Sequence, residues 1–272
     1  SACLVGSEMC IRDRYKGWVG RLLNIDRTVL TNNRRKMSAK YACAEFLWYM
    51  HRNAPLEMIA HYAPQYTKFA ESNGQVWGAY GKRFVDLIPE LLGDLRANIY
   101  SRRAVIPLYQ PKDLIAASWA KDIPCTLSWQ FINDNEKLCM IATMRSNDLW
   151  LGFPYDVFVN TCVQRYIADL LGWECGWYQH QVGDMHIYEH NIAGADEAIH
   201  ANWDMLAPAK FTDLSSEFEL SEALQLEEFH RVEKPVSKVV SGRNSMIASI
   251  LNCLLGNDCK WEELNHVNRR GN

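Results

Sequence analysis

The chain has 272 residues, of which 48% are hydrophobic and 22% are charged, with a formal net charge of −3. These values suit one large globular domain, and the small charge gives no electrostatic reason to expect a nucleic-acid or membrane partner. No apolar run reaches the roughly 20 residues that a membrane-spanning helix needs. The nine cysteines form no Cys-x-x-Cys pair. We therefore expect a cytoplasmic protein in a reducing compartment, with no metal site.

The amino-terminal segment, residues 1–14, carries no hydrophobic periodicity and resembles a translated adapter or expression scar. Its apolar part is too short for a signal peptide. We expect the native amino terminus to be lost or altered. No linker rich in Pro, Gly or Ser follows, so residues 15–272 are predicted to form a single domain.

The first strongly patterned segment is residues 38–50, an apolar run in which Ser38 is placed to cap a helix. Glu45 is the only acidic group inside it. It could lie on a partly exposed face, but a carboxylate with apolar neighbours all round indicates a functional reason for burial. Residues 83–98 predict a second, amphipathic helix, and residues 104–109 predict a strand.

Two segments, residues 125–132 and 137–145, alternate as β-strands do and are joined by a short turn rich in Asn and Asp. They predict a β-hairpin. Alternate positions from Leu127 to Phe131 share the apolar face, which places Cys125 on that side at the start of the first strand.

From Tyr155 the apolar period becomes helical over four turns, and Gly172 is typical of a helix end. Asp156 lies in the first turn, where an acidic side chain can simply complement the helix dipole. The remaining pattern predicts one strand and two helices: residues 177–188, 219–231 and 243–255.

Residues 144–156 read Met-Arg-Ser-Asn-Asp-Leu-Trp-Leu-Gly-Phe-Pro-Tyr-Asp. This run resembles the nucleotide-binding signature of the thymidylate synthase family, which reads Arg-Ser, then Asp, then Leu-Gly-x-Pro-aromatic-Asn. In the family that Asn reads uracil by donating and accepting hydrogen bonds, whereas the carboxylate of Asp156 can only accept unless it is protonated. Cytosine offers an amino donor where uracil offers a carbonyl. Asp156 therefore favours a cytidine nucleotide, as in the family's cytidylate hydroxymethylase branch.

Further matches occur in the family's order over residues 38–190. Pro124-Cys125 followed by Gln130-Phe131 resembles the catalytic cysteine strand, and Glu45 in Glu-Phe-Leu-Trp resembles the catalytic glutamate helix. The resemblance implies these catalytic residues: Glu45, Tyr80, Cys125 and Asp156. It implies these substrate-binding residues: Arg102, Arg103, Gln130, Arg145, Ser146, Asp148, Gly152, His186 and Tyr188. It implies these cofactor-binding residues: Tyr66, Asp148, Gly152 and Tyr155.

Each of these residues, taken alone, has an ordinary structural explanation. Cys125 could be an inert buried thiol, His186 a core histidine, and Arg102 with Arg103 a solvated pair at a strand start. Their joint occurrence in one order makes these explanations together improbable.

The resemblance also implies a fold and a reaction. The fold is α/β (α+β): a mixed β-sheet flanked by helices, forming a single catalytic domain and a sheet-to-sheet homodimer in which Arg102 and Arg103 reach the neighbouring subunit's phosphate. The cofactor is 5,10-methylenetetrahydrofolate, and the substrate is dCMP or CMP. Cys125 adds to carbon 6 of the pyrimidine, carbon 5 takes up the one-carbon unit, and water captures it to give the 5-hydroxymethyl product. Nearby arginines are expected to lower the pKa of the Cys125 thiol.

The sequence departs from the family pattern at several points. Thr126 and Tyr66 stand where thymidylate synthases have His and Trp, which favours water capture over hydride transfer. The phosphate loop is reduced to Asp26-Arg27-Thr28 at best, and the closing segment is not visible in residues 265–272.

Three alternatives stay open. The chain could be a thymidylate synthase or dUMP hydroxymethylase with an unusual Asp. It could use CMP in place of dCMP. It could also be a nucleotide-binding or RNA-binding homologue without turnover, although no obligatory nucleic acid is expected.

Overall fold

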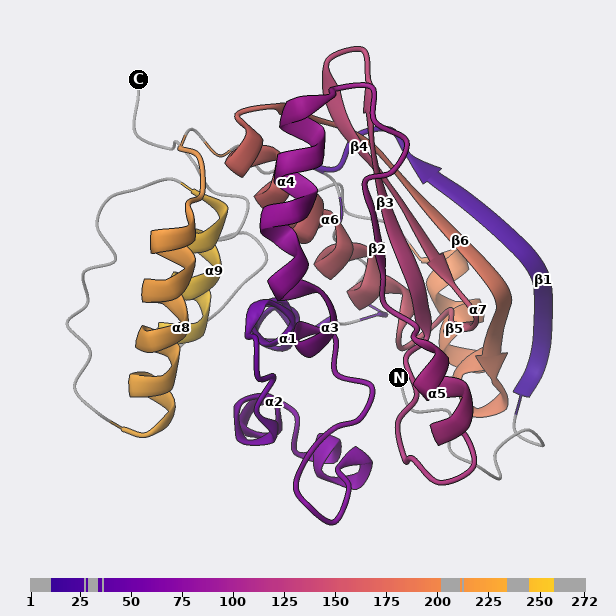
Figure 1. Cartoon of the computed structure of the whole chain (residues 1–272). Helices are drawn as coiled ribbons and strands as arrows, with labels where there is room; N and C mark the ends of the chain where they lie inside the picture. Colours follow the sequence, from indigo (N-terminus) through magenta and orange to yellow (C-terminus); the bar gives the residue numbers. More distant parts are fainter. Residues whose placement is uncertain are drawn as a thin grey trace, which may run out of the picture.

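The computed structural model describes residues 11–26, 28, 34–35, 37–201, 211, 213–233 and 245–256. They form a mixed β-sheet flanked by helices, as expected (Figure 1). The strands run in the order β1-β6-β4-β3-β2, and β5 pairs with β6. The strand bounds are β1 Ile11–Leu22, β2 Val105–Pro107, β3 Thr126–Asp134, β4 Lys137–Met144, β5 Asn147–Asp148 and β6 Glu174–Tyr188.

The predicted hairpin is confirmed as the antiparallel pair β3 and β4. Its turn is closed by Asn135 and Glu136, both with positive φ. Trp129 and Phe131 are fully buried, as the alternation predicts. The register shifts between Thr126 and Ser128, so Thr126 is also buried although simple alternation places it on the polar face. This irregularity lies beside Cys125.

The amino-terminal strand β1 runs antiparallel along β6, from Ile11 opposite Tyr188 to Leu22 opposite Tyr178. Residues 11–14 therefore pair with the sheet, and the expectation that residues 1–14 are a non-native segment stays a prediction. Residues 1–10 lie outside the described part of the chain. The pattern failed there because a strand at the edge of the sheet alternates only weakly between polar and apolar residues.

The predicted helix at residues 38–50 is α1, Ala39–Met50, and Ser38 Oγ accepts the Tyr41 N–H as its cap. It is apolar all round because it lies in the interior of the helical layer (Figure 1). The predicted single helix at 83–98 is instead three pieces: α3 Gly81–Phe84, the 3₁₀ turn η3 Val85–Leu87, and α4 Ile88–Ala97. Pro89 lies in the first turn of α4, the part of a helix in which proline is best tolerated.

The remaining helices surround this core. Their bounds are α2 Leu56–Tyr62, η2 Pro64–Phe69, α5 Pro111–Ala116, α6 Phe153–Leu171, η4 Glu189–Asn191, α7 Ile192–His200, α8 Glu217–Arg231 and α9 Met246–Leu255. Helix α6 ends at Gly172, whose φ of +70° is left-handed, as predicted. Helices α1, α4 and α6 lie on one side of the sheet, with α8 and α9 beyond them (Figure 1).

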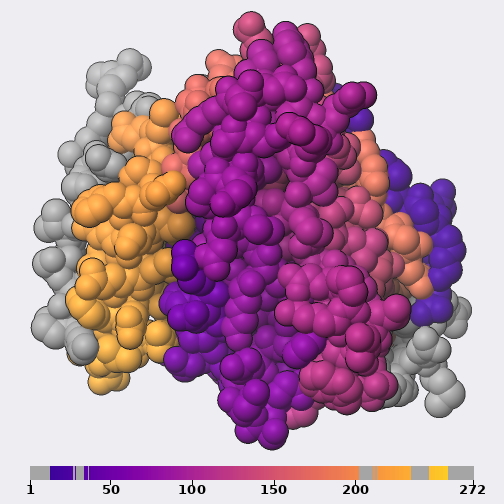
Figure 2. All heavy atoms as spheres, in the orientation of Figure 1, coloured from indigo at the N-terminus to yellow at the C-terminus, as the bar shows by residue number. Residues whose placement is uncertain are grey.

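The outer helices are joined to the core by polar as well as apolar contacts. In the space-filling view the orange surface of α8 lies directly against the purple surface that includes α2 (Figure 2). Tyr62 at the end of α2 donates a hydrogen bond of 3.0 Å to the Glu227 carboxylate on α8. No helix among the described residues is long and apolar enough to cross a membrane.

Candidate active site

A cavity of about 540 Å³ opens between α1, the start of α6 and the ends of β5 and β6. It gathers side chains from segments that are far apart in the sequence. These predicted site residues line it: Glu45, Tyr66, Tyr80, Cys125, Ser146, Asp148, Gly152, Tyr155, Asp156, His186 and Tyr188.

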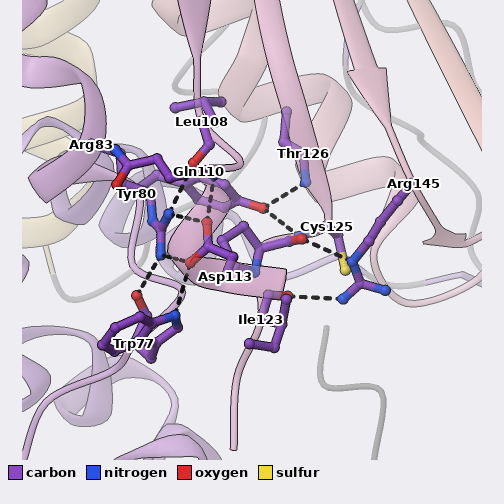
Figure 3. A network of polar contacts seen from close by, with 11 residues as sticks. Trp77, Tyr80, Arg83, Leu108, Gln110, Asp113, Ile123, Cys125, Thr126 and Arg145 are labelled. Atoms are coloured by element: carbon purple, nitrogen blue, oxygen red, sulfur yellow. Dashed lines mark hydrogen bonds and ion pairs between the residues drawn. The ribbon is translucent and has the colours of Figure 1, made fainter. Parts of the chain in front are cut away.

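The corner that carries Cys125 is fixed by Tyr80 (Figure 3). The Tyr80 hydroxyl accepts the backbone N–H groups of Cys125 and Thr126, at 3.1 and 3.0 Å. The Cys125 carbonyl in turn accepts the N–H of Arg145 at 2.8 Å. Burial raises the pKa of the Tyr80 phenol, so it stays protonated. Tyr80 therefore positions the backbone beneath the thiol by accepting two amide hydrogens.

Arg145 binds the backbone of the segment that precedes Cys125 (Figure 3). Its guanidinium donates to the carbonyls of Pro124 and Ile123, both at 2.9 Å. Burial raises the pKa of the Cys125 thiol, and the positive charge of Arg145 offsets only part of this rise. The expectation that arginines give a lowered thiol pKa is wrong for the protein alone, because desolvation outweighs one cation.

Behind this corner lies a buried ion pair that sequence reasoning missed. Arg83 donates to both oxygens of Asp113, at 2.7 and 2.9 Å, and also to the carbonyls of Leu108 and Trp77. Both side chains are almost fully buried, at 3% and 0% exposure. The pair connects α3, which follows Tyr80, to α5 (Figure 3).

Glu45 is buried and faces two phenols. Tyr41 and Tyr66 each donate to Glu45 Oε1, at 2.6 and 2.9 Å, and their hydroxyls lie 3.0 Å from each other. Burial raises the pKa of Glu45, and the two hydrogen bonds only partly oppose this. A carboxyl group with a raised pKa gives up its proton less readily than a solvated one, which suits a role in proton transfer.

Asp156 lies in the first turn of α6, as predicted, but its environment is unlike a surface helix end. Burial raises its pKa to about 7, with further repulsion from Glu45 and Asp148, while the polar side chain of Asn147 lowers it in part. The dipole of α6 alone would have lowered it. A carboxyl that titrates near neutral pH inside a cavity is typical of a functional site.

Asp148, Gly152 and Tyr155 shape the cavity wall at the start of α6. Asp148 is buried, and its Oδ1 accepts the N–H groups of Trp150 and Leu151, at 2.9 and 3.1 Å. Gly152 caps α6. The Tyr155 hydroxyl accepts the Ser38 N–H at 2.8 Å, which joins this wall to α1.

Ser146, His186 and Tyr188 form a second polar group in the cavity. Ser146 Oγ lies 3.4 Å from His186 Nδ1 and 3.3 Å from the Asp184 carbonyl. The ring of His186 meets the edge of Tyr188 at 5.2 Å. These hydroxyl and imidazole groups are suited to hydrogen bonds with phosphate and sugar oxygens.

Arg102, Arg103 and Gln130 do not line the cavity of their own chain. Both arginines are exposed, and Arg103 forms an ion pair of 3.0 Å with Asp94. Gln130 lies on β3, with its amide 3.5 Å from the Arg102 carbonyl. Within one chain, therefore, these residues do not reach the cavity in which the predicted substrate would bind.

Several cavity residues carried no sequence signal. Arg35 is buried, donates to the Trp150 carbonyl at 2.9 Å and lies over the rings of Trp150 and Tyr155. Among the described residues it is the one arginine that lines the cavity. Asp122 and Asn147 also line it, and burial raises the pKa of Asp122. Asn147 stands within the run 144–156 at a position that the family signature leaves open.

Two expectations fall outside the described part of the chain: the phosphate-loop residue Arg27 and the closing segment at 265–272. In the part that is described, no group of three or more His, Cys, Asp or Glu side chains could hold a metal ion.

The α/β fold thus places a cysteine, at the start of a strand, in one cavity with two carboxyls of raised pKa, an arrangement that suits nucleophilic chemistry. The thymidylate synthase family profile matches residues 23–235. The chain belongs to the thymidylate synthase family.

Individual relatives agree with this assignment. The thymidylate synthase of Bacillus phage phi3T is 31% identical over 185 residues, which cover 63% of this chain and 64% of that protein. The thymidylate synthase of Bacillus subtilis subsp. natto matches to the same extent. The chain thus spans just under two thirds of the length of these relatives. The solved structure of thermostable thymidylate synthase A from Bacillus subtilis superposes with a TM-score of 0.61 at 25% identity, over 73% of each chain.

Proposed function

We propose that the protein is a folate-dependent hydroxymethylase of a cytidine monophosphate, with dCMP favoured and CMP possible in its place. The observation that carries this proposal is Asp156, a carboxyl in the same cavity as Cys125 and Glu45. As a carboxylate it accepts from the exocyclic amino group of cytosine. The uracil carbonyl would instead meet an acceptor, and such a mismatch can cost about 10⁴-fold in discrimination.

The residues of the cavity supply the steps of the reaction. Cys125 adds as a thiolate to carbon 6 of the pyrimidine, which makes carbon 5 nucleophilic. Asp156 holds the amino group and stabilises the proton at ring nitrogen 3. Once carbon 5 has received the one-carbon unit and lost its proton, an exocyclic methylene group remains. Glu45, with Tyr41 and Tyr66, orients the water that adds to this methylene carbon and relays its proton. Cys125 then leaves carbon 6, and the product is the 5-hydroxymethyl nucleotide.

The cavity also fits methylenetetrahydrofolate, which when bound supplies the one-carbon unit. Aromatic side chains line one side, including Trp48, Tyr66 and Tyr155, and offer flat apolar surface to a fused ring. Asp148 offers a buried acceptor for ring N–H groups. Arg35 is placed at the same wall and suits the carboxylates of a glutamyl tail.

The test is tritium release from carbon-5-labelled dCMP, CMP and dUMP, each with methylenetetrahydrofolate, and identification of the products by mass. We expect release from a cytidine nucleotide with a hydroxymethyl product. The Asp156→Asn variant should lose at least about 100-fold of this activity and gain relative activity on dUMP. Asp196→Asn, an exposed residue on α7, is the matched control and should behave as the unaltered protein.

The second candidate is thymidylate synthesis from dUMP, favoured by the names of the relatives. Release from dUMP alone would support it and contradict the role of Asp156. Absence of release from every nucleotide would instead favour a nucleotide-binding or RNA-binding homologue.

We also propose a homodimer in which Arg102 and Arg103 bind the phosphate in the partner's cavity. Their exposure, away from their own cavity, supports this role, as does the partly exposed face of the sheet around Gln130. Mixing the inactive variants Cys125→Ser and Arg103→Ala should restore part of the activity, because a mixed dimer keeps one complete site. Failure to restore it, with mixed dimers present by native mass spectrometry, would contradict the assignment.

A further inference from the structure

One carboxyl in the cavity, that of Asp122, has no part in the reaction described above. Asp122 comes three residues before Cys125 and lines the same cavity. Its side chain is partly buried, and none of the hydrogen bonds between described residues involves its carboxyl oxygens. A carboxylate that is removed from water and satisfied by no protein donor is costly, so its place in the cavity indicates a role toward a ligand or a reacting group.

The backbone on both sides of Asp122 is held in place. On one side the Lys121 N–H donates to Glu71 Oε1 at 2.8 Å. On the other side the guanidinium of Arg145 donates to the carbonyls of the next two residues, both at 2.9 Å. The chain therefore fixes the position of Asp122 through its neighbours and leaves its carboxyl oxygens open to the cavity.

The carboxyl of Asp122 lies against the backbone of Gly78. A Cβ added to Gly78 would stand 2.4 Å from Asp122 Oδ2 and 3.3 Å from the backbone nitrogen of Pro124. One point is thus close both to the carboxyl oxygen and to the residue directly before Cys125. The carboxyl is therefore turned toward the end of its segment that carries the thiol, in space that only a residue without a side chain at position 78 leaves open.

The reaction needs a group that accepts the proton of the Cys125 thiol. Burial raises the pKa of this thiol, so the protein alone holds it in the protonated form at neutral pH, whereas the thiolate is the form that adds to carbon 6. Two other carboxyls of the cavity are already engaged. Glu45 accepts from two phenols, and the proposed function assigns Asp156 to the cytosine ring. Asp122 has no such engagement.

Arg145 connects the two groups electrostatically. Burial raises the pKa of Asp122 and of Cys125, and the positive charge of Arg145 opposes the rise in each, while a charged Asp122 disfavours the thiolate. One negative charge on the pair is therefore stabilised and two are not, which is the condition for a shared proton. The ionisable groups around the pair are Tyr66, Glu71, Tyr80, Arg83, Arg145 and Asp156.

We propose that Asp122 accepts the proton of the Cys125 thiol as the sulfur adds to the pyrimidine, through one water molecule in the cavity. The S–H bond breaks while the bond from sulfur to carbon 6 forms, the proton passes to Asp122, and the electron pair of the carbon 5–carbon 6 double bond becomes available at carbon 5. When Cys125 leaves carbon 6, its thiolate takes the proton back. This inference rests on the proposed function for the addition of Cys125, but not for the identity of the base.

The first measurement is the rate at which iodoacetamide alkylates Cys125 in the full chain without nucleotide, from about pH 6 to 10, with the modified peptide identified by mass. Asp122→Asn keeps the size of the side chain and removes its charge. We expect the midpoint for Cys125 to fall by about 0.5–1 pH unit, and alkylation at pH 7 to become about 3–10 times faster, because no carboxylate then opposes the thiolate. The exposed-site variant Asp196→Asn is the control and should match the unaltered protein.

The second measurement is single-turnover tritium release from the carbon-5-labelled nucleotide with methylenetetrahydrofolate over the same pH range. At pH 7 we expect Asp122→Asn to be about 100-fold slower although it holds more thiolate, because the acceptor is gone. By about pH 9 its rate should approach that of the unaltered protein, since the thiol then ionises into solvent. Asp122→Glu keeps a carboxyl and should recover part of the rate at pH 7. Asp122→Ser repeats both measurements if the Asn variant does not fold.

The two rates together decide the inference. Faster alkylation with slower turnover supports it, since a carboxylate that only suppressed the thiolate would, once removed, speed both. An unchanged midpoint for Cys125 in Asp122→Asn would show that Asp122 does not face the thiol, and turnover that rises with alkylation would show that it accepts no proton. Turnover lowered equally at every pH would indicate a structural defect and would also overturn the inference.

Failure of the proposed function gives a different result. Release from dUMP alone by the unaltered protein would contradict the role of Asp156 and leave the comparison at Asp122 intact. Absence of release from every nucleotide would overturn the proposed function, and with it the step assigned to Asp122.

Discussion

The ion pair of Arg83 and Asp113 gives the sharpest prediction for stability. The Asp113 carboxylate accepts two bonds from Arg83, one from the Gln110 N–H at 2.6 Å and one from the Trp77 indole at 2.8 Å. Asp113→Asn keeps the shape but turns an NH₂ group toward two of these donors. Two charge-assisted bonds of about 1.5–2 kcal/mol each are lost, and the guanidinium is left buried, so we expect a loss of roughly 3–4 kcal/mol.

Urea unfolding at neutral pH measures this loss as a lower midpoint at unchanged slope. The matched control is Asp86→Asn, which breaks an equally short pair with Arg52, 2.7 Å, whose side chains are 63% and 68% exposed. We expect less than about 0.5 kcal/mol there. The double variant Arg83→Met with Asp113→Leu should recover most of the stability, because no buried charge remains. A loss from Asp113→Asn no larger than the control would refute the reasoning.

Three further predictions concern the site itself. Tyr80→Phe leaves the N–H groups of Cys125 and its neighbour without an acceptor, so unfolding free energy should fall by about 1–3 kcal/mol in urea titrations. Burial raises the pKa of Asp156 to about 7, so its ionisation destabilises the folded protein, and the unfolding free energy of the unaltered protein relative to Asp156→Asn should decline between about pH 4 and 7. At pH 8 the variant should be about 1–2 kcal/mol more stable, after allowance for the screening of charge in the open cavity. A difference that does not depend on pH would contradict the assigned pKa. Gly81→Ala would bring Cβ to 2.1 Å from the His51 carbonyl and should lower the melting temperature markedly, whereas Gly93→Ala, with open space around it, should raise it slightly.

Sequence reasoning recovered the elements whose periodicity is set by burial. Helix α6 and the hairpin of β3 and β4 follow from the apolar pattern alone, because each packs one well-defined face against the core. The long strand β1 was missed, since its pairing with β6 is set by backbone hydrogen bonds that leave little trace in the side chains. The helix predicted at residues 83–98 is interrupted by η3, just before Pro89. This interruption was not predicted from the sequence, because the apolar spacing is amphipathic on both sides of it.

In the candidate site, too, some residues were predicted from the sequence and others were not. Cys125, Glu45 and Asp156 were found because their neighbours form a motif in order, and they do share a cavity. Arg35 and Asn147 were not found, because their importance depends on which distant segments fold against them. The net pKa of the thiol was misjudged for a related reason: counting nearby arginines in a sequence says nothing about how much solvent the fold removes.

The pairing of β1 with β6 has a consequence for how the protein is made. The first and last strands of the described chain are neighbours, and the cavity draws on residues from Arg35 to Tyr188. A chain emerging from the ribosome cannot complete the cavity until β6 has been synthesised, so contacts of high sequence separation must close late. Until then β4 lacks its parallel neighbour and presents an unpaired edge. We expect slow folding and a demand for chaperones that a thermodynamic measurement on the finished protein would not reveal.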